Sequence, residues 1–177
     1  MQPSHAEKSP NGMCITIAIL GIQSVFTVGY WISYFSGPPP PFPQHWYTTY
    51  ESAFPLADIS VIVLNSLLCI FHLCAASGRR RSGLKHGLIA VGGMYFLVAM
   101  DILFNIRNGM YAYVLPGHGT ADQQLNMIVE LVINIWCVIC PTWLTHWIFE
   151  NLDWFVADPR MTVHHGDTVS LLLPTAD

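Results

Sequence analysis

Four long apolar stretches, separated by shorter polar segments, dominate the pattern along the chain. They cover roughly residues 13–35, 53–77, 87–113 and 125–149. Each holds the roughly 20 mainly apolar residues that a helix needs to cross a bilayer, and none shows the two-residue alternation of a membrane strand. The pattern therefore predicts an all-α fold, an integral membrane four-helix bundle with polar tails at 1–12 and 151–177.

The segment from Glu51 to Leu73, which overlaps the second apolar stretch, carries four polar residues at a strict spacing of seven: Glu51, Asp58, Asn65 and His72. Because two helical turns take about seven residues, we expect these side chains to share one narrow face. The rest of the stretch is apolar and suits contact with lipid. A helix of this kind must turn its ionisable face toward protein or toward a wet cavity.

The other three stretches also carry polar stripes, at the steps of three and four that place side chains on one helical face. These stripes are Gln23, Thr27, Tyr30 and Tyr34; Asp101, Asn105 and Asn108, with Arg107 just off that face; and Asn126, Glu130, Asn134 and Cys137. Four helices with one stripe each are expected to form a bundle whose stripes face a common interior.

Basic residues indicate the orientation of this bundle. Arg79, Arg80, Arg81 and Lys85 lie between the second and third stretches and make up four of the seven Lys and Arg residues. By the positive-inside rule this segment faces the cytoplasm, so both termini are predicted to be cytoplasmic. The acids and amides then gather in the outer half, beneath a proline-rich and aromatic loop at 36–52. We expect one pocket there, opening outward or sideways into lipid.

The amino-acid composition narrows the class of protein. The chain is 53% hydrophobic and only 10% charged, whereas soluble domains run near a quarter charged. Few basic residues are available for nucleic acid, and all five cysteines fall in apolar stretches, unlike those of a disulfide-stapled secreted fold. We expect a multi-pass protein of the endoplasmic reticulum or another internal membrane. Its expected partners are the lipid bilayer, a lipophilic small molecule and, as a further option, other membrane proteins.

Three acids are the candidate catalytic residues: Asp58, Asp101 and Glu130. Amides across membrane helices are usually adhesive, at about 0.6 kcal/mol each, but an ionised acid near the bilayer centre costs about 2.5–3.5 kcal/mol. A protonated acid beside an ionised one would supply a general acid and a general base. The competing interpretation is a purely structural ion pair with Arg107. The candidate substrate-binding residues are Glu51, Asn105, Asn108, Asn134, Arg107, Tyr30, Trp46 and Tyr111.

The sequence predicts neither a metal nor a cofactor. His164 and His165 are adjacent, which is a poor chelating geometry without further ligands. His45 and His118 could meet near the pocket mouth with Asp122, but scattered histidines are more often polar residues at interfaces. No phosphate-cradling glycine loop, nucleophile elbow or HExxH motif is present.

Cys137-Val-Ile-Cys140 resembles the CxxC motif of vitamin K epoxide reductases, which are also small four-helix membrane proteins. The resemblance covers this motif and the helix count, and it implies a thiol oxidoreductase that uses these two cysteines. The first luminal loop of that family carries a cysteine pair, whereas residues 36–52 contain none.

Three functional hypotheses are consistent with these patterns. The first is a membrane enzyme that needs no cofactor and acts on a lipophilic small molecule by proton transfer, as an isomerase or cyclase of an isoprenoid- or polyketide-derived substrate. Aromatic side chains would tolerate cationic charge in such a reaction. The second is a non-catalytic scaffold or transporter subunit, and the third is the thiol oxidoreductase.

Two features bear on helix geometry. Gly92 and Gly93 are predicted to permit close approach of a neighbouring helix. Pro55 is expected in the first turn of the second helix, where its missing N–H does little harm.

Overall fold

The structure is a computed structural model that describes residues 9–38, 41–42, 45–75 and 79–156. Every regular element in these ranges is helical. Four spans are long and apolar enough to cross a membrane, with mean hydropathy of 1.7 to 2.0: Met13–Ser36, Trp46–Cys74, Arg80–Arg107 and Ala121–Glu150. Large apolar side chains cover their outer faces, as lipid requires. The predicted all-helical fold with four membrane-length helices is confirmed. Most of both predicted tails lies outside the described residues.

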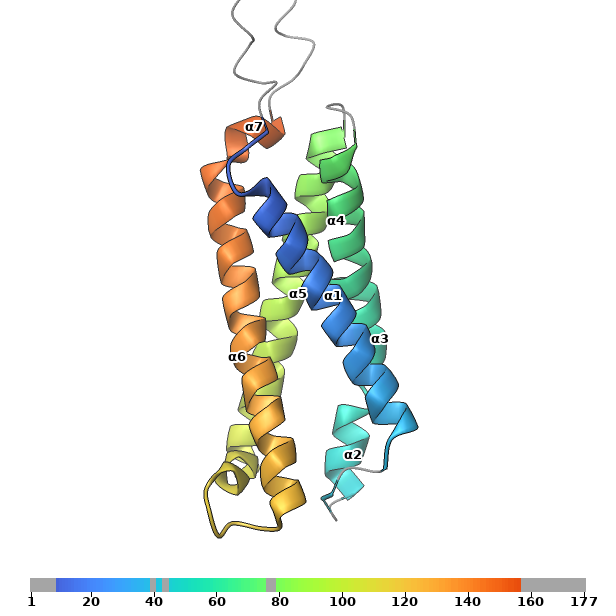
Figure 1. Cartoon of the computed structure of the whole chain (residues 1–177), viewed down its shortest axis with the longest axis vertical. Coiled ribbons are helices and arrows are strands. Elements are labelled where there is room, and N and C mark those ends of the chain that lie inside the picture. The colour runs from blue at the N-terminus through green and yellow to red at the C-terminus, as the bar shows by residue number, and fades with distance from the viewer. Residues whose placement is uncertain (1–8, 39–40, 43–44, 76–78, 157–177) are drawn as a thin grey trace, which may run out of the picture.

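The helix α1 (Met13–Ser36) lies obliquely across the others (Figure 1). It begins near α6 (Ala121–Glu150) and α7 (Leu152–Val156), where the Trp147 indole N–H donates to the Asn11 carbonyl at 2.8 Å. It then diverges from α6 and ends near α3 (Pro55–Ala57) (Figure 1). The start of α1 and α7 lie at the same end of the bundle (Figure 1).

The second span is a broken helix. It consists of α2 (His45–Glu51), α3, a π-helical segment η1 (Asp58–Val63) and α4 (Leu64–Cys74). The break follows from Pro55, which begins α3 as expected. In a continuous helix its ring would clash with the carbonyl four residues earlier, at Glu51. The span begins at Trp46, seven residues before the predicted position 53 and within the loop that was expected to cover the bundle.

The break and the π-helical turn split the stripe of four polar residues. Each additional residue in a turn rotates the following side chains by roughly 100°. Asn65 and His72 accordingly face α5 (Arg80–Arg107): His86 Nδ1 lies 2.9 Å from Asn65 Oδ1, and the His72 ring stacks on the His86 ring. Glu51 and Asp58 instead line a cavity, so the four residues do not share one face.

Local signals explain two further boundary shifts. The third span ends at Arg107 because Gly109 adopts a left-handed conformation (φ 67°), a common helix terminator. A separate 3₁₀ helix, η3 (Met110–Val114), follows it. Thr120 and Gln123 form a capping box, with the Thr120 N–H donating to Gln123 Oε1 at 2.9 Å, so α6 begins at Ala121 rather than near 125.

Two packed clusters of buried apolar side chains lie along the bundle. The main core lies toward the end that holds α7 and includes Leu20, Met94, Cys140, Leu144 and Trp147. The loop-end core lies toward the opposite end and consists of Phe42, Tyr47, Met110 and Met127. Along α6, Glu130 and Asn134 lie between Met127 of the loop-end core and Cys140 of the main core.

Adjacent glycines on α5 offer a test of the packing. A Cβ atom at Gly93 would lie 2.5 Å from Val61 Cγ1 of η1, whereas a Cβ atom at Gly92 would meet nothing within 4 Å. We therefore expect Gly93→Leu to lower the free energy of unfolding by about 1–3 kcal/mol through overpacking. Gly92→Leu should leave it nearly unchanged. Thermal unfolding of both variants in detergent measures the difference, and equal stability would contradict the close approach.

Candidate functional site

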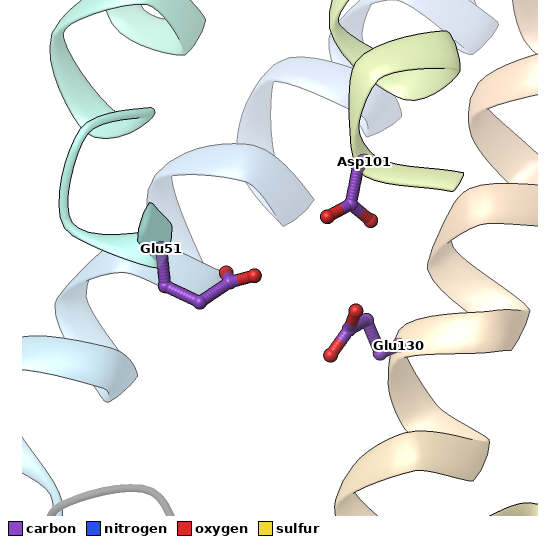
Figure 2. Close-up of side chains that lie close together, drawn as sticks. All are labelled: Glu51, Asp101 and Glu130. Atoms are coloured by element: carbon purple, nitrogen blue, oxygen red, sulfur yellow. The ribbon is translucent and has the colours of Figure 1, made fainter. Parts of the chain in front are cut away.

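Three acidic side chains from three helices form one group, hereafter the acid cluster: Glu51 at the end of α2, Asp101 on α5 and Glu130 on α6 (Figure 2). One carboxylate oxygen of each lies within 4.8 Å of the others. Glu51 and Glu130 are 5% and 7% exposed. The sequence predicted that these three acids and Asp58 would gather at one level of the bundle; Asp58 lies outside this group but lines the same cavity.

Neutral donors surround two members of the acid cluster. The Asn105 amide N–H donates to Glu130 Oε1 and, at 3.3 Å, to Asp101 Oδ1. The Asn134 amide donates to Asp101 Oδ2 at 2.6 Å, and the Tyr47 hydroxyl donates to Glu130 Oε2 at 2.6 Å. All four carboxylate oxygens of Asp101 and Glu130 therefore accept a hydrogen bond.

Glu51 differs from its two neighbours. Its carboxylate points toward Asp101 and Glu130 (Figure 2), but its Oε1 atom is buried without a hydrogen-bond partner among the described residues. The Tyr30 side chain interacts with the same carboxylate. An unpaired buried polar atom costs about 1–3 kcal/mol. Glu51 therefore has a free position for a proton, a ligand or an ion.

The acid cluster lies at a cavity of about 670 Å³, a volume typical of small-molecule sites. Asp58 also lines this cavity, and its Oδ2 accepts a 2.8 Å hydrogen bond from the Trp31 indole N–H. The walls come from α1, the second span, α5 and α6 and are mostly apolar or aromatic. They include Phe26, Tyr30, Trp31, Phe54, Ile62, Met94, Leu97, Val98, Val129, Val132, Ile133 and Trp136.

The other predicted site residues are placed differently. Asn134 and Tyr30 line the cavity, while Asn105 joins two members of the acid cluster. The Tyr111 hydroxyl accepts a 3.0 Å hydrogen bond from Asn134, and burial raises the pKa of Tyr111. Five of the predicted substrate-binding residues do not line the cavity: Asn105, Tyr111, Trp46, Arg107 and Asn108.

Arg107, the predicted counter-charge, is exposed at the end of α5. Among the described residues no ion pair joins it to Asp58, Asp101 or Glu130. Asn108 donates instead to the Phe104 carbonyl at 2.8 Å. The purely structural ion pair with Arg107, which was the alternative to a functional role for the acids, is therefore absent among the described residues.

Two side chains that bond to the cavity acids were not predicted from the sequence. Tyr47 belongs to the aromatic loop at 36–52, yet it is 2% exposed and its hydroxyl donates to Glu130. Trp31 continues the four-residue step from Gln23 and Thr27, and this signal could have placed it on the inner face. Both residues donate a hydrogen bond to a carboxylate.

The two cysteines of the CxxC motif lie in different surroundings. Cys137 lines the cavity, whereas Cys140 is packed in the main core, and both are free thiols. Gln23 lies 3.9 Å from the Cys137 sulfur through its amide nitrogen. The thiol oxidoreductase hypothesis would therefore use a thiol that faces the same cavity as the acids.

The acid cluster is also the group of described residues that could hold a metal ion. Its oxygen ligands suit a hard divalent cation such as Mg²⁺ or Mn²⁺. The histidines considered from the sequence do not contribute: His118 is exposed, and the side chains of His45, His164 and His165 lie outside the described part of the structure.

Comparison with protein-family models, curated proteins and solved structures yields no match.

Proposed function

We propose that the protein is a membrane enzyme that converts a lipophilic small molecule by acid–base proton transfer, as an isomerase or cyclase. The observation that carries this proposal is the single cavity of about 670 Å³ lined by Glu51, Asp58, Asp101 and Glu130. Acids are costly in the membrane interior, and these four converge on space large enough for a substrate. An isoprenoid- or polyketide-derived molecule would suit the apolar walls.

The hydrogen bonds suggest a division of roles. Every oxygen of Asp101 and Glu130 accepts a hydrogen bond from a neutral donor, which suits a carboxylate that takes up a proton. Glu51 has an oxygen without a partner and is the better candidate to give a proton to the substrate. Tyr30, Trp31 and Trp136 line the same cavity, and their ring faces would stabilise a cationic intermediate.

Proton transfer at carbon leaves a label that can be followed without knowing the substrate. Membranes that contain the protein are incubated in D₂O with a lipid extract of the native organism, and the recovered lipids are analysed by mass spectrometry. We expect one or a few lipophilic species to gain carbon-bound deuterium only when the protein is present. No protein-dependent deuterium would favour the scaffold or transporter hypothesis.

A second candidate is metal-assisted proton transfer, which the spacing of the acid cluster favours. A divalent cation held by Glu51, Asp101 and Glu130 would polarise a substrate oxygen. We expect a chelator to abolish deuterium incorporation, and Mg²⁺ or Mn²⁺ to restore it, if this candidate is correct. Incorporation that is indifferent to chelation supports the metal-free reaction.

The basic residues between the second and third spans support a cytoplasmic position for the end that holds α7 and the start of α1. Arg79 and Arg81 are exposed near this end, and positively charged loops favour the cytoplasmic side. The acid cluster would then lie in the opposite, outer half. An internal membrane such as the endoplasmic reticulum remains the location that we propose.

A further inference from the structure

Packed side chains border the cavity in both directions along the bundle. The main core lies toward the α7 end, where Leu20, Cys140 and Leu144 are 0–1% exposed. The loop-end core lies toward the opposite end, where Tyr47, Met110 and Met127 are 0–2% exposed. Within the described residues, these clusters leave little room for a substrate to enter along the bundle axis.

The side of the bundle between α1 and α6 is different. Phe26 on α1 and Val132 on α6 line the cavity, yet 69% and 60% of their surfaces are exposed. Gly29 also lines the cavity and is exposed, and a Cβ atom built on it would meet nothing within 4 Å. The cavity wall therefore reaches the outer surface where these two helices diverge (Figure 1).

This surface belongs to two membrane-length spans. Its neighbours are apolar: Val25 beside Phe26 is 72% exposed, and Val129 on the facing helix is 46% exposed. A mouth bordered by such residues opens on hydrocarbon rather than on water.

We propose that the cavity is loaded sideways from the bilayer, through a mouth between α1 and α6 at which Gly29 leaves the opening free. The molecule that fits is uncharged and mainly apolar, with a polar or unsaturated reacting group that faces the acid cluster. The reaction at that group rests on the proposed function, whereas the route of entry does not. Charged, water-soluble molecules are excluded as substrates.

The route can be tested with a photoreactive probe that the protein does not convert. Full-length protein is reconstituted in phosphatidylcholine vesicles with an uncharged aryl diazirine carrying a long alkyl chain. After illumination, mass spectrometry compares labelling of Met94, which lines the cavity and is 1% exposed, with labelling of Leu103. Leu103 lies on the same helix, is 65% exposed and does not line the cavity.

The mouth is closed by Gly29→Trp. We expect this variant to reduce the ratio of Met94 to Leu103 labelling several-fold, and Gly29→Ala to leave it near the wild-type value. The matched control is Gly21→Trp, because Gly21 lies on the same helix, has no atom within 4 Å of its built Cβ and does not line the cavity. Val132→Trp closes the mouth from the α6 side and replaces Gly29→Trp if that variant fails to fold.

Three results would overturn the proposal: absence of Met94 labelling in the wild type, an unchanged ratio when the mouth is closed, or equal labelling of Met94 by a charged, water-soluble diazirine. The result of the labelling test can be separated from the result of the test for acid–base proton transfer. Loss of deuterium incorporation with normal Met94 labelling would reject the enzyme and retain the entrance. Normal deuterium incorporation, together with Met94 labelling that Gly29→Trp does not reduce, would retain the enzyme and reject the entrance.

Discussion

Glu130→Gln is expected to reduce deuterium incorporation by about 10²–10⁴-fold, the usual contribution of a general acid or base. Glutamine has nearly the same shape as glutamate, so it can remain between Asn105 and Tyr47. Its amide can neither take up nor release a proton during the reaction. The measurement is the rate at which the species labelled in D₂O gains deuterium, normalised to the amount of folded protein in the membrane.

The matched control is Glu150→Gln, the same chemical change on the same helix. The Glu150 side chain is 61% exposed and pairs with His146 at 3.1 Å, far along α6 from the cavity. We expect its rate to equal that of the wild type. Full activity in Glu130→Gln would reject proton transfer by this residue, and equal losses in both variants would point to a general effect on the protein.

Asn105→Asp is expected to be the most destabilising single change at the site, by about 3–5 kcal/mol, the cost of an uncompensated buried charge. Asn105 is 0% exposed and donates to both Asp101 and Glu130. An aspartate there removes both hydrogen bonds and places a fourth carboxyl group among three others. Chemical or thermal unfolding in detergent measures the loss.

The matched control is Asn108→Asp, which makes the same chemical change at an exposed position. Asn108 lies next to the end of the same helix, is exposed and bonds to the Phe104 carbonyl, so we expect a cost below about 1 kcal/mol. Similar losses in the two variants would contradict the role of Asn105 as the link between the acids. Recovery of Asn105→Asp stability with Mg²⁺ or Mn²⁺ would favour the metal-assisted candidate.

Part of the site could be predicted because helical periodicity acts locally. The four-residue steps of Glu130 and Asn134, and of Asp101 and Asn105, placed these side chains on inner faces, and the structure joins them by hydrogen bonds. The exposed position of Arg107 was harder to anticipate, because it depends on where α5 ends. Gly109 ends that helix, but a glycine by itself does not show which face of the last turn is covered.

Glu51 shows where periodicity fails. A uniform helix would have aligned it with Asp58, Asn65 and His72, but Pro55 breaks the span and the π-helical segment then rotates the residues C-terminal to it. Glu51 consequently ends a separate short helix, α2, and reaches Asp101 and Glu130. The sequence contains the proline but carries no local signal for the π-helical turn, which packs against α1 and α5.

The amino-acid sequence by itself determined that this chain forms four membrane-length helices with acids on inner faces, because hydrophobic length and helical periodicity are properties of each segment alone. Only the tertiary structure decided which acids meet, which donors they receive and where the cavity reaches lipid. Those features depend on the oblique path of α1 and on how the segments on either side of the Pro55 break pack against helices that are distant along the chain.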